Sequence, residues 1–382
     1  MSEITSIFDL EALAQERLPA VIFDYVHGGA EQQLTLQRNL DDLRALALRQ
    51  HDMRDVSGAN TAVTMVGEPA RIPLAIGPTG LAGLTWANGE CEEAAAAEAF
   101  GVPYCLSMMS ICSIEDVAKA THKPFWFQLY LMKKREVNES LIRRAHAAGC
   151  SALVLTLDLH VQGKRWADAR NGLSVPPRLT VSNTMDMLRH PRWLVGMARS
   201  KRRTFGNLQG EVKQARNVSA LSEWIEGQFD PSFDFDTVKW VRNAWDRKLI
   251  LKGIMHPDDA RLAVDAGADA IIVSNHGGRQ LDGAPSSISV LPEIAAAVND
   301  RIEVLFDGGI RTGSDIVKAM GRGAHACLSG RACLYGLAAN GREGVACALK
   351  IFEQELKDCM ALVGVTDIRE LDPGLVTAQP AL

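Results

Sequence analysis

The chain has 382 residues, of which 47% are hydrophobic and 23% charged, and its formal net charge is −5. This is the composition of a globular protein with a large core, and nothing in the charge suggests a nucleic-acid partner. The eight cysteines form no CxxC pair and no metal-ligand spacing. With no signal-peptide pattern, we expect reduced thiols, no metal and a cytoplasmic location. No apolar run approaches the roughly 18 residues of a membrane span.

The first 70 residues are expected to form a helical and irregular segment, in which apolar residues recur at helix spacing until "HGGA" at 27–30. After it, short apolar runs alternate with alanine-rich stretches typical of helices. The runs predict eight strands, at 72–77, 102–107, 124–130, 152–158, 248–253, 268–274, 302–308 and 325–330. Eight such units favour a closed (β/α)8 TIM barrel over an open doubly wound sheet, and no G-x-G-x-x-G motif follows any strand. We expect one domain over residues 1–382.

A long insertion interrupts this alternation after the fourth strand, and we assign it to residues 175–236. Its part at 183–210 mixes basic residues with large apolar ones. The basic residues are Arg189, Arg192, Arg199, Lys201, Arg202 and Arg203, and the apolar ones are Leu188, Trp193, Leu194 and Val195. Such a mixture suits a segment lying on anionic lipid. It suits equally a solvated helix that packs one face on the barrel or on another subunit, so the pattern alone leaves both interpretations open.

Polar and glycine residues stand where the first six predicted strands end. In barrels of this class, the functional residues lie at the carboxyl ends of strands and in the loops that follow. The candidates are Pro78, Thr79, Gly80, Ser107, Gln128, Tyr130, Thr156, Asp158, Lys252, Ser274, His276 and Arg279. Any one of them could be a polar residue that merely lines the open end of the barrel, but the whole set is more typical of a binding site.

The last two strands end in glycine-rich turns that each carry an arginine. The seventh ends in "DGGIR", with Asp307, Gly309 and Arg311, and the eighth in "GRA", with Gly330 and Arg331. Backbone N–H groups and guanidinium groups that converge there predict a phosphate site. The alternative is that these glycines only form tight turns or helix caps.

His276 stands in "SNHGGRQLDG" and is the natural proton acceptor, because an imidazole can take and return a proton near neutral pH. It would need an orienting carboxylate, for which Asp158 is the candidate. Arg279 and Arg165 could clamp a substrate carboxylate, since a guanidinium matches a planar anion.

Lys252 ends a strand otherwise made of leucine and isoleucine, and a buried ammonium needs a negative partner. It could form an imine with a carbonyl substrate, or lie as a cation beside an electron-accepting ring. Ser107, Gln128 and Thr156 could hold the edge of such a flat heterocycle by neutral hydrogen bonds.

Taken together, these motifs resemble the FMN-dependent 2-hydroxy-acid oxidizing family, which includes glycolate oxidases, mandelate dehydrogenases and lactate dehydrogenases. The resemblance runs from 18–30 to 334–341. It is most specific in "SNHGGRQLDG", "WFQLY", "ILKGI" and "DGGIRTGSDIVKA". Within the family the chain is most similar to the bacterial quinone-linked L-lactate dehydrogenases, through the segments 36–39, 47–50 and 229–242.

The resemblance implies a role for each candidate. His276 would remove a proton from the substrate, and Asp158 would stabilise the imidazolium. Arg279 and Tyr25 would bind the substrate carboxylate. In addition, Arg165 would close over that carboxylate, Tyr130 would hydrogen-bond the 2-hydroxyl, and Lys252 would stabilise negative charge on the reduced flavin.

It also implies FMN as the cofactor. The isoalloxazine ring would be held by Pro78, Thr79, Gly80, Ser107, Gln128 and Thr156, with Ser274 nearby. The ribityl phosphate would be held by Asp307, Gly309, Arg311, Gly330 and Arg331. Met108 and Met109 in "SMMS", together with Gln162, depart from the family pattern around the substrate side chain. The acid is therefore left open, with L-lactate favoured and a larger, peptide-derived substrate as an alternative.

Gly80 is typical of the family's dehydrogenases, whereas oxidases tend to carry alanine there. Together with the basic insertion it favours a peripheral contact with the inner face of the cell membrane, where electrons would pass to a quinone. The family also suggests a homotetramer. The alternatives are an oxidase that passes electrons to oxygen, and a colourless phosphate-binding lyase or isomerase with Lys252 as its amine.

Overall fold

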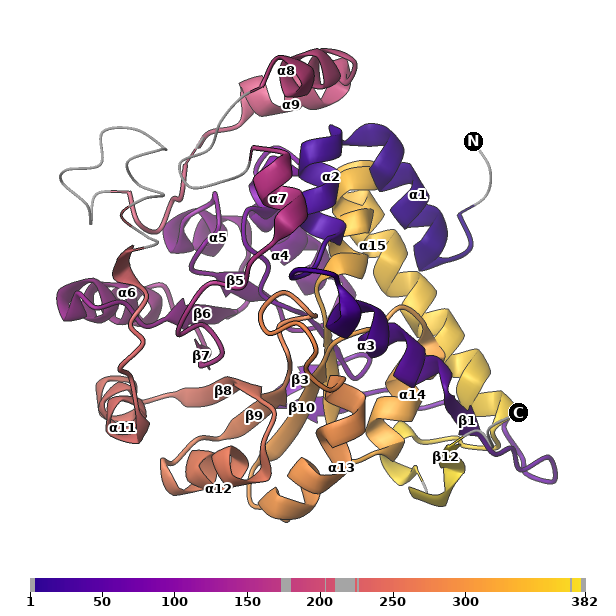
Figure 1. Cartoon of the computed structure of the whole chain (residues 1–382). Helices are drawn as coiled ribbons and strands as arrows, with labels where there is room; N and C mark the ends of the chain where they lie inside the picture. The colour runs from indigo at the N-terminus through magenta and orange to yellow at the C-terminus, as the bar shows by residue number, and fades with distance from the viewer. Residues whose placement is uncertain are drawn as a thin grey trace.

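The computed structural model describes residues 4–172, 180–202, 204–209, 224, 227–371 and 373–378. At its centre eight parallel strands lie side by side in the order β4-β11-β10-β9-β8-β7-β6-β5 (Figure 1). A parallel bridge between Ile76 and Tyr104 joins the two edges, so the sheet closes into a barrel. The strands are β4 (Leu74–Ile76), β5 (Cys105–Ser107), β6 (Trp126–Tyr130), β7 (Ala152–Thr156), β8 (Lys248–Ile254), β9 (Ala270–Val273), β10 (Glu303–Asp307) and β11 (Ala326–Ser329). Each overlaps one predicted run, which confirms the (β/α)8 barrel.

Helices surround the barrel, as the alanine-rich stretches predict (Figure 1). They are α4 (Gly89–Phe100), α5 (Ile114–Ala120), α6 (Arg135–Ala147), α11 (Phe235–Ala244), α12 (Pro257–Asp265), α13 (Ser287–Val298), α14 (Gly313–Gly321) and α15 (Arg331–Leu362). Alternate strand residues such as Phe127, Leu153 and Leu251 pack outward against these helices. The residues between them point inward and form a separate apolar cluster that includes Trp126 and Ile250. Full burial on both faces explains why the strands are continuous apolar runs.

The N-terminal segment is helical only in its first part, so the expectation for residues 1–70 needs a correction. It forms α1 (Ile7–Arg17), α2 (Ala20–His27) and α3 (Leu34–Arg44), followed by the short strands β1 (Leu46–Leu48), β2 (Val63–Met65) and β3 (Glu68–Ala70). The β2–β3 hairpin buries Met65 and Ala70 in the interior cluster of the barrel. In addition, Glu68 accepts a hydrogen bond from Trp126 Nε1 at 3.0 Å. The hairpin therefore closes the barrel at the end opposite the carboxyl ends of the strands.

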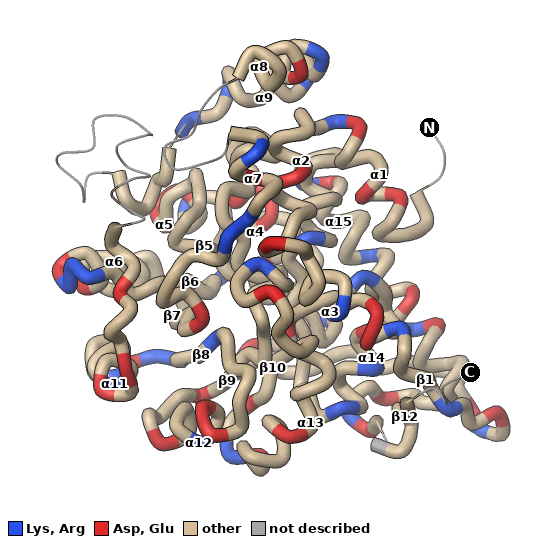
Figure 2. The backbone as a smooth tube through the Cα atoms, in the orientation of Figure 1, with Lys and Arg blue, Asp and Glu red and all other residues tan. Residues whose placement is uncertain are grey.

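After β7 the chain forms α7 (Trp166–Arg170), and the insertion at 175–236 then contributes α8 (Val181–Leu188) and α9 (Pro191–Arg199). Its predicted residues 175–179, 203, 210–223, 225 and 226 lie outside the described residues. Figure 1 shows α8 and α9 side by side beyond α2, and Figure 2 shows basic positions along this pair and the chain that leaves it. Asp186 accepts from the Ala20 backbone N–H at 2.7 Å, which fastens α8 to α2. Of the helices described, none has the length and apolar character that crossing a bilayer would require.

Candidate active site

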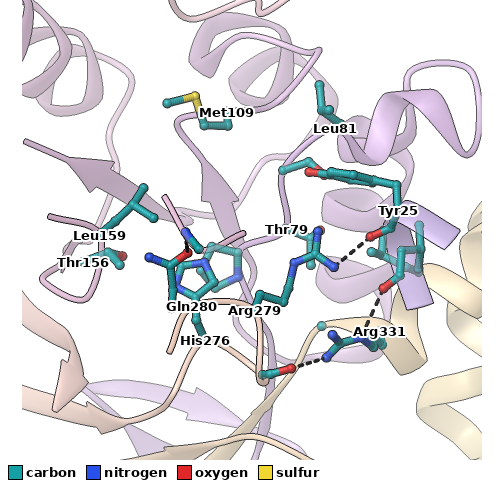
Figure 3. Close-up of a pocket in the computed structure, with 18 of the residues that line it drawn as sticks. Tyr25, Thr79, Leu81, Met109, Thr156, Leu159, His276, Arg279, Gln280 and Arg331 are labelled. Carbon is teal, nitrogen blue, oxygen red and sulfur yellow. Dashed lines mark hydrogen bonds between the residues drawn. The ribbon is translucent and has the colours of Figure 1, made fainter. Parts of the chain in front are cut away.

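A cavity of about 510 Å³ opens at the carboxyl ends of the barrel strands (Figure 3). Its wall contains all the predicted site residues except Ser107, Gln128, Asp158 and Ser274. Those four lie behind the wall, and their hydrogen bonds reach residues on it. Separate strand ends thus bring together the residues that the sequence pattern selects, as parallel barrels do.

One ring nitrogen of His276 contacts the Asp158 carboxylate, and the other points toward the cavity. Its Nδ1 lies 2.8 Å from Asp158 Oδ1, and its Nε2 lies 3.3 Å from the Tyr130 hydroxyl. Burial alone would raise the pKa of Asp158, but its interaction and hydrogen bond with His276, together with the charge of Lys252, outweigh burial and hold that pKa below its ordinary value. Because an ionised carboxylate can only accept, Nδ1 donates and Nε2 is left to accept a proton.

Two arginines lie over Tyr25 at the mouth of the cavity. The Arg279 guanidinium is 4.9 Å from the centre of the Tyr25 ring, and that of Arg165 is 5.6 Å away. Arg279 donates to the backbone oxygens of Tyr25 and Gly28, and Arg165 lies 3.4 Å from Asp168. Burial lowers the pKa of Arg279, and the positive charge of Arg165 lowers it further. An entering anion would relieve this repulsion, so the geometry suits a carboxylate.

Lys252 lies at the floor of the cavity within a small polar network. Its ammonium donates to Ser274 Oγ at 2.9 Å and lies 3.1 Å from Asp307 Oδ2. Burial alone would lower the pKa of Lys252, but Asp307 and Asp158 raise it above the ordinary value, so the side chain stays charged.

A neutral hydrogen-bond chain lies behind the same wall. Ser107 donates to Gln128 at 3.1 Å, and Gln128 donates to Thr156 at 3.0 Å. Within the described part of the chain, the buried Ser329 hydroxyl on the wall has no hydrogen-bond partner. A cation, neutral donors and an unpaired hydroxyl together fit a flat heterocycle that carries carbonyl and nitrogen atoms.

The far end of the cavity is rich in arginine. The half-buried Arg331 donates to the backbone oxygens of Val26, Gly28 and Gly277 at 2.8–3.1 Å. Burial, together with the charges of Arg279 and Arg311, lowers the pKa of Arg331 to about 9. Partly buried guanidinium groups that repel one another favour a bound anion, and a phosphate supplies the charge and the acceptor oxygens. The residues present therefore fit FMN at both of its ends.

Several residues of the site have no sequence signal that identifies them. Gln280 donates to the backbone oxygens of Asp158 and Val161, and it accepts from the Gly163 N–H, which fixes the loop that carries Asp158. It stands inside "HGGRQ", so its neighbours could have drawn attention to it. The cavity wall also has the apolar residues Leu81, Leu84, Leu159, Phe205 and Phe229, which lie in short turns and connecting segments without periodicity.

Comparisons with known proteins agree with this geometry. Residues 14–378 match the FMN-dependent dehydrogenase family. The chain is 42% identical to an L-lactate dehydrogenase of Caulobacter vibrioides, over 97% of this chain and 96% of that protein. Among solved structures, the monotopic membrane protein (S)-mandelate dehydrogenase has a TM-score of 0.94 at 35% identity, covering 99% of this chain and 100% of that one. A mandelate oxidase has a TM-score of 0.84 at 35% identity, covering 100% of both.

Barrel and cavity thus define a flavin-dependent oxidoreductase built on a (β/α)8 scaffold. The chain belongs to the FMN-dependent dehydrogenase family, and its cofactor is FMN. Its activity is the oxidation of a small 2-hydroxy acid, as a dehydrogenase or oxidase.

Proposed function

We propose that this protein oxidises a short L-2-hydroxy acid, with L-lactate as the leading candidate, to the 2-keto acid and passes the electrons to a quinone. The observation that carries the proposal is the contact between His276 Nδ1 and Asp158, which leaves Nε2 toward a cavity that also contains two arginines. The identity of 42% to an L-lactate dehydrogenase over nearly the whole chain supports the substrate.

In this proposal the protein's own groups bind the acid and move its proton. Arg279, with Arg165 above it, holds the carboxylate beside Tyr25, and the Tyr130 hydroxyl orients the 2-hydroxyl group. His276 Nε2 accepts the proton that the acid releases, and Asp158 stabilises the resulting imidazolium.

FMN, when bound, supplies the acceptor for the two electrons that leave the substrate. We assign its ring to Pro78, Thr79, Gly80, Ser107, Gln128, Thr156, Lys252 and Ser274. Its phosphate we assign to Asp307, Gly309, Arg311, Gly330 and Arg331. We also propose that residues 1–382 act as one domain and assemble as a homotetramer, which sedimentation of the purified protein tests.

The test of substrate and acceptor has two stages. In the first, the flavin absorbance near ~450 nm is followed without oxygen after addition of L-lactate, L-mandelate, glycolate or longer 2-hydroxy acids. We expect L-lactate to bleach the flavin fastest, and failure of all these acids would refute the substrate class. In the second, the bleached enzyme receives either oxygen or a short-chain ubiquinone analogue. Rapid reoxidation by oxygen with peroxide release would favour an oxidase, for which the similar mandelate oxidase is the precedent.

We further propose that α8 and α9 dock on the inner face of the cell membrane. Their exposed side chains include Val181, Met185, Leu188 and Val195, and the similar (S)-mandelate dehydrogenase is a monotopic membrane protein. The test is sedimentation with vesicles of anionic phospholipid. Replacing Met185 and Leu188 by Asp should lower binding at least about tenfold, since burial of each contributes about 1.5–3 kcal/mol. The control is Leu262→Asp, an exposed leucine on α12, and equal loss there would contradict the proposal.

A further inference from the structure

The N-terminal helices α1 and α2 lie outside the barrel, beside α15, and α2 reaches the arginine-rich end of the cavity (Figure 1). The backbone oxygens of Val26 and Gly28, at the end of α2, accept hydrogen bonds from Arg331. The carbonyl end of a helix carries partial negative charge, which favours a cation there. One of the two arginines that we assign to the FMN phosphate is therefore held by α2.

Arg311, the other of these arginines, lies after β10 and lines the cavity. Its backbone N–H donates to Asp315 Oδ2 at 3.0 Å, and its guanidinium donates to the Ile310 backbone oxygen at 3.0 Å. Within the part of the chain that the structure describes, no carboxylate forms an ion pair with this guanidinium. Its charge is thus available to an anion, but a long side chain loses entropy when it is kept in one orientation.

The ring of Tyr335 restricts the orientation of Arg311. Tyr335 stands near the start of α15 and is fully buried. The Arg311 guanidinium lies over its ring, 5.6 Å from the ring centre. A cation over an aromatic face is attracted by the negative charge of that face. The contact therefore limits the directions that the guanidinium can take.

Two rings of α2 hold Tyr335 in turn. The Tyr335 ring stacks with that of Phe23 at a centroid distance of 6.4 Å, and Phe23 stacks with His27 at 5.3 Å. In addition, His27 Nδ1 lies 3.0 Å from the Tyr335 hydroxyl oxygen. Both the ring and the hydroxyl of Tyr335 are thus fixed by the same helix.

Glu11 of α1 sets the direction of the hydrogen bond between His27 and Tyr335. Its Oε1 lies 3.0 Å from His27 Nδ1. Burial alone would raise the pKa of Glu11, but the hydrogen bond and charge of His27, together with the charge of Arg311, outweigh burial and hold that pKa below its ordinary value. Because an ionised carboxylate can only accept, Nδ1 donates, and the Tyr335 oxygen is a second acceptor for the same N–H.

We propose that Tyr335 is a positioning residue that holds the Arg311 guanidinium toward the phosphate of FMN. His27 and Glu11 support Tyr335, so α1 and α2 take part in cofactor binding although they lie outside the barrel. The inference rests on the phosphate site assigned under the proposed function. A preorganised site loses less freedom on binding, so removing the support weakens FMN binding while both arginines are still present.

The experiment titrates the full-length apoprotein with FMN or with riboflavin, which has the same ring and no phosphate, and follows the quenching of flavin fluorescence. Tyr335→Leu removes the aromatic face, and we expect it to raise the FMN dissociation constant about tenfold while that of riboflavin changes less than about twofold. Tyr335→Phe keeps the face and loses the hydroxyl, so we expect a rise of about threefold for FMN.

His27→Phe tests the same support from its other side. It keeps a ring beside Phe23 and removes the N–H that the Tyr335 oxygen accepts, so it should also raise the FMN dissociation constant about threefold. His27 is partly exposed, and this variant therefore remains a test if Tyr335→Leu does not fold.

A double-mutant cycle measures whether Tyr335 acts through Arg311. In an Arg311→Met background, Tyr335→Leu should change the FMN dissociation constant less than about twofold, because the contact that it removes is already absent. The control is Phe352→Leu, which alters another fully buried aromatic residue of α15. It should lower the free energy of unfolding without changing the ratio of the two dissociation constants.

The possible failures differ from one another. Equal losses of FMN and riboflavin in Tyr335→Leu, or an additive loss in the Arg311→Met background, would overturn the positioning role. Unchanged FMN affinity in His27→Phe would overturn the support from α2. If Arg311→Met binds FMN as the wild type does, the phosphate assignment fails, and the inference fails with it. Failure of every 2-hydroxy acid to bleach the flavin would refute the proposed substrate and leave these affinities unaffected.

Discussion

Asp158 Oδ1 lies 2.8 Å from His276 Nδ1, although the two residues are 118 positions apart in the chain. The other oxygen of Asp158 is buried and has no hydrogen-bond partner among the residues described. The hydrogen bond to the His276 imidazole is therefore the side-chain contact that orients this carboxylate. Gly253, at φ +100°, permits this approach, since a Cβ there would lie 2.8 Å from the Asp158 side chain.

Replacing Asp158 by Asn should slow bleaching of the bound flavin by L-lactate about 10²–10⁴-fold. The amide can present its N–H to Nδ1 and favour the wrong tautomer, and it no longer stabilises the imidazolium. Stopped-flow absorbance under nitrogen measures the rate, and the flavin spectrum verifies that FMN is retained. The control is Asp265→Asn, on the exposed side of α12, which should bleach normally. Normal bleaching by Asp158→Asn would refute the role of the carboxylate.

The same substitution should change how stability depends on pH. The pKa of Asp158 in the folded protein lies below the ordinary value of 3.8, so its ionised form stabilises the fold at pH above 3.8. This contribution is lost as the pH falls below that value. The difference in free energy of unfolding between the wild type and Asp158→Asn should therefore shrink on acidification, which urea unfolding at several pH values would measure.

Replacing Lys252 by Met should lower the free energy of unfolding by about 3 kcal/mol, because it leaves the largely buried Asp307 without its cation. Adding Asp307→Asn should restore most of that stability. Neither variant should recover fast bleaching, since both lack the positive charge beside the flavin. Urea unfolding of the FMN-saturated proteins and stopped-flow bleaching separate the two effects. Fast bleaching by the double variant would show that the lysine is needed only for the ion pair.

The strands of the barrel were predictable because each is buried on both faces and reads as an unbroken apolar run. The β2–β3 hairpin was not, since its strands of three residues carry no periodic signal and are stabilised by the barrel interior that they close. The site residues could be selected because they stand at strand ends. The long-range contacts that hold the surrounding loops could not: Asn39 and Asn275, which precedes His276, exchange two hydrogen bonds at 2.8 Å across 236 positions. The apolar wall of the cavity was equally hidden, because single apolar residues far apart in the chain become a wall only after folding.

Replacing Arg331 by Met should raise the FMN dissociation constant about 30-fold or more, since a hydrogen bond to a charged group contributes about 2 kcal/mol. Riboflavin provides the matched control, because it has the same ring and no phosphate. Quenching of flavin fluorescence by apoprotein measures both affinities. We expect the variant to lose its preference for FMN while binding riboflavin as the wild type does. An equal loss for both flavins would mean that Arg331 supports the fold and not the phosphate.

Gly278 and Gly283 of "SNHGGRQLDG" both lie at positive φ but differ in the space around them. Gly278 has φ +73°, and a Cβ there would overlap the backbone of Leu36 in α3, whereas Gly283 has φ +84° and open space around it. Gly278→Ala should therefore lower the free energy of unfolding by about 3 kcal/mol or more, by strain and overlap together. Gly283→Ala should cost only the conformational strain of about 1 kcal/mol. Urea unfolding compares the two, and equal costs would show that the Gly278 loop does not need its close approach to α3.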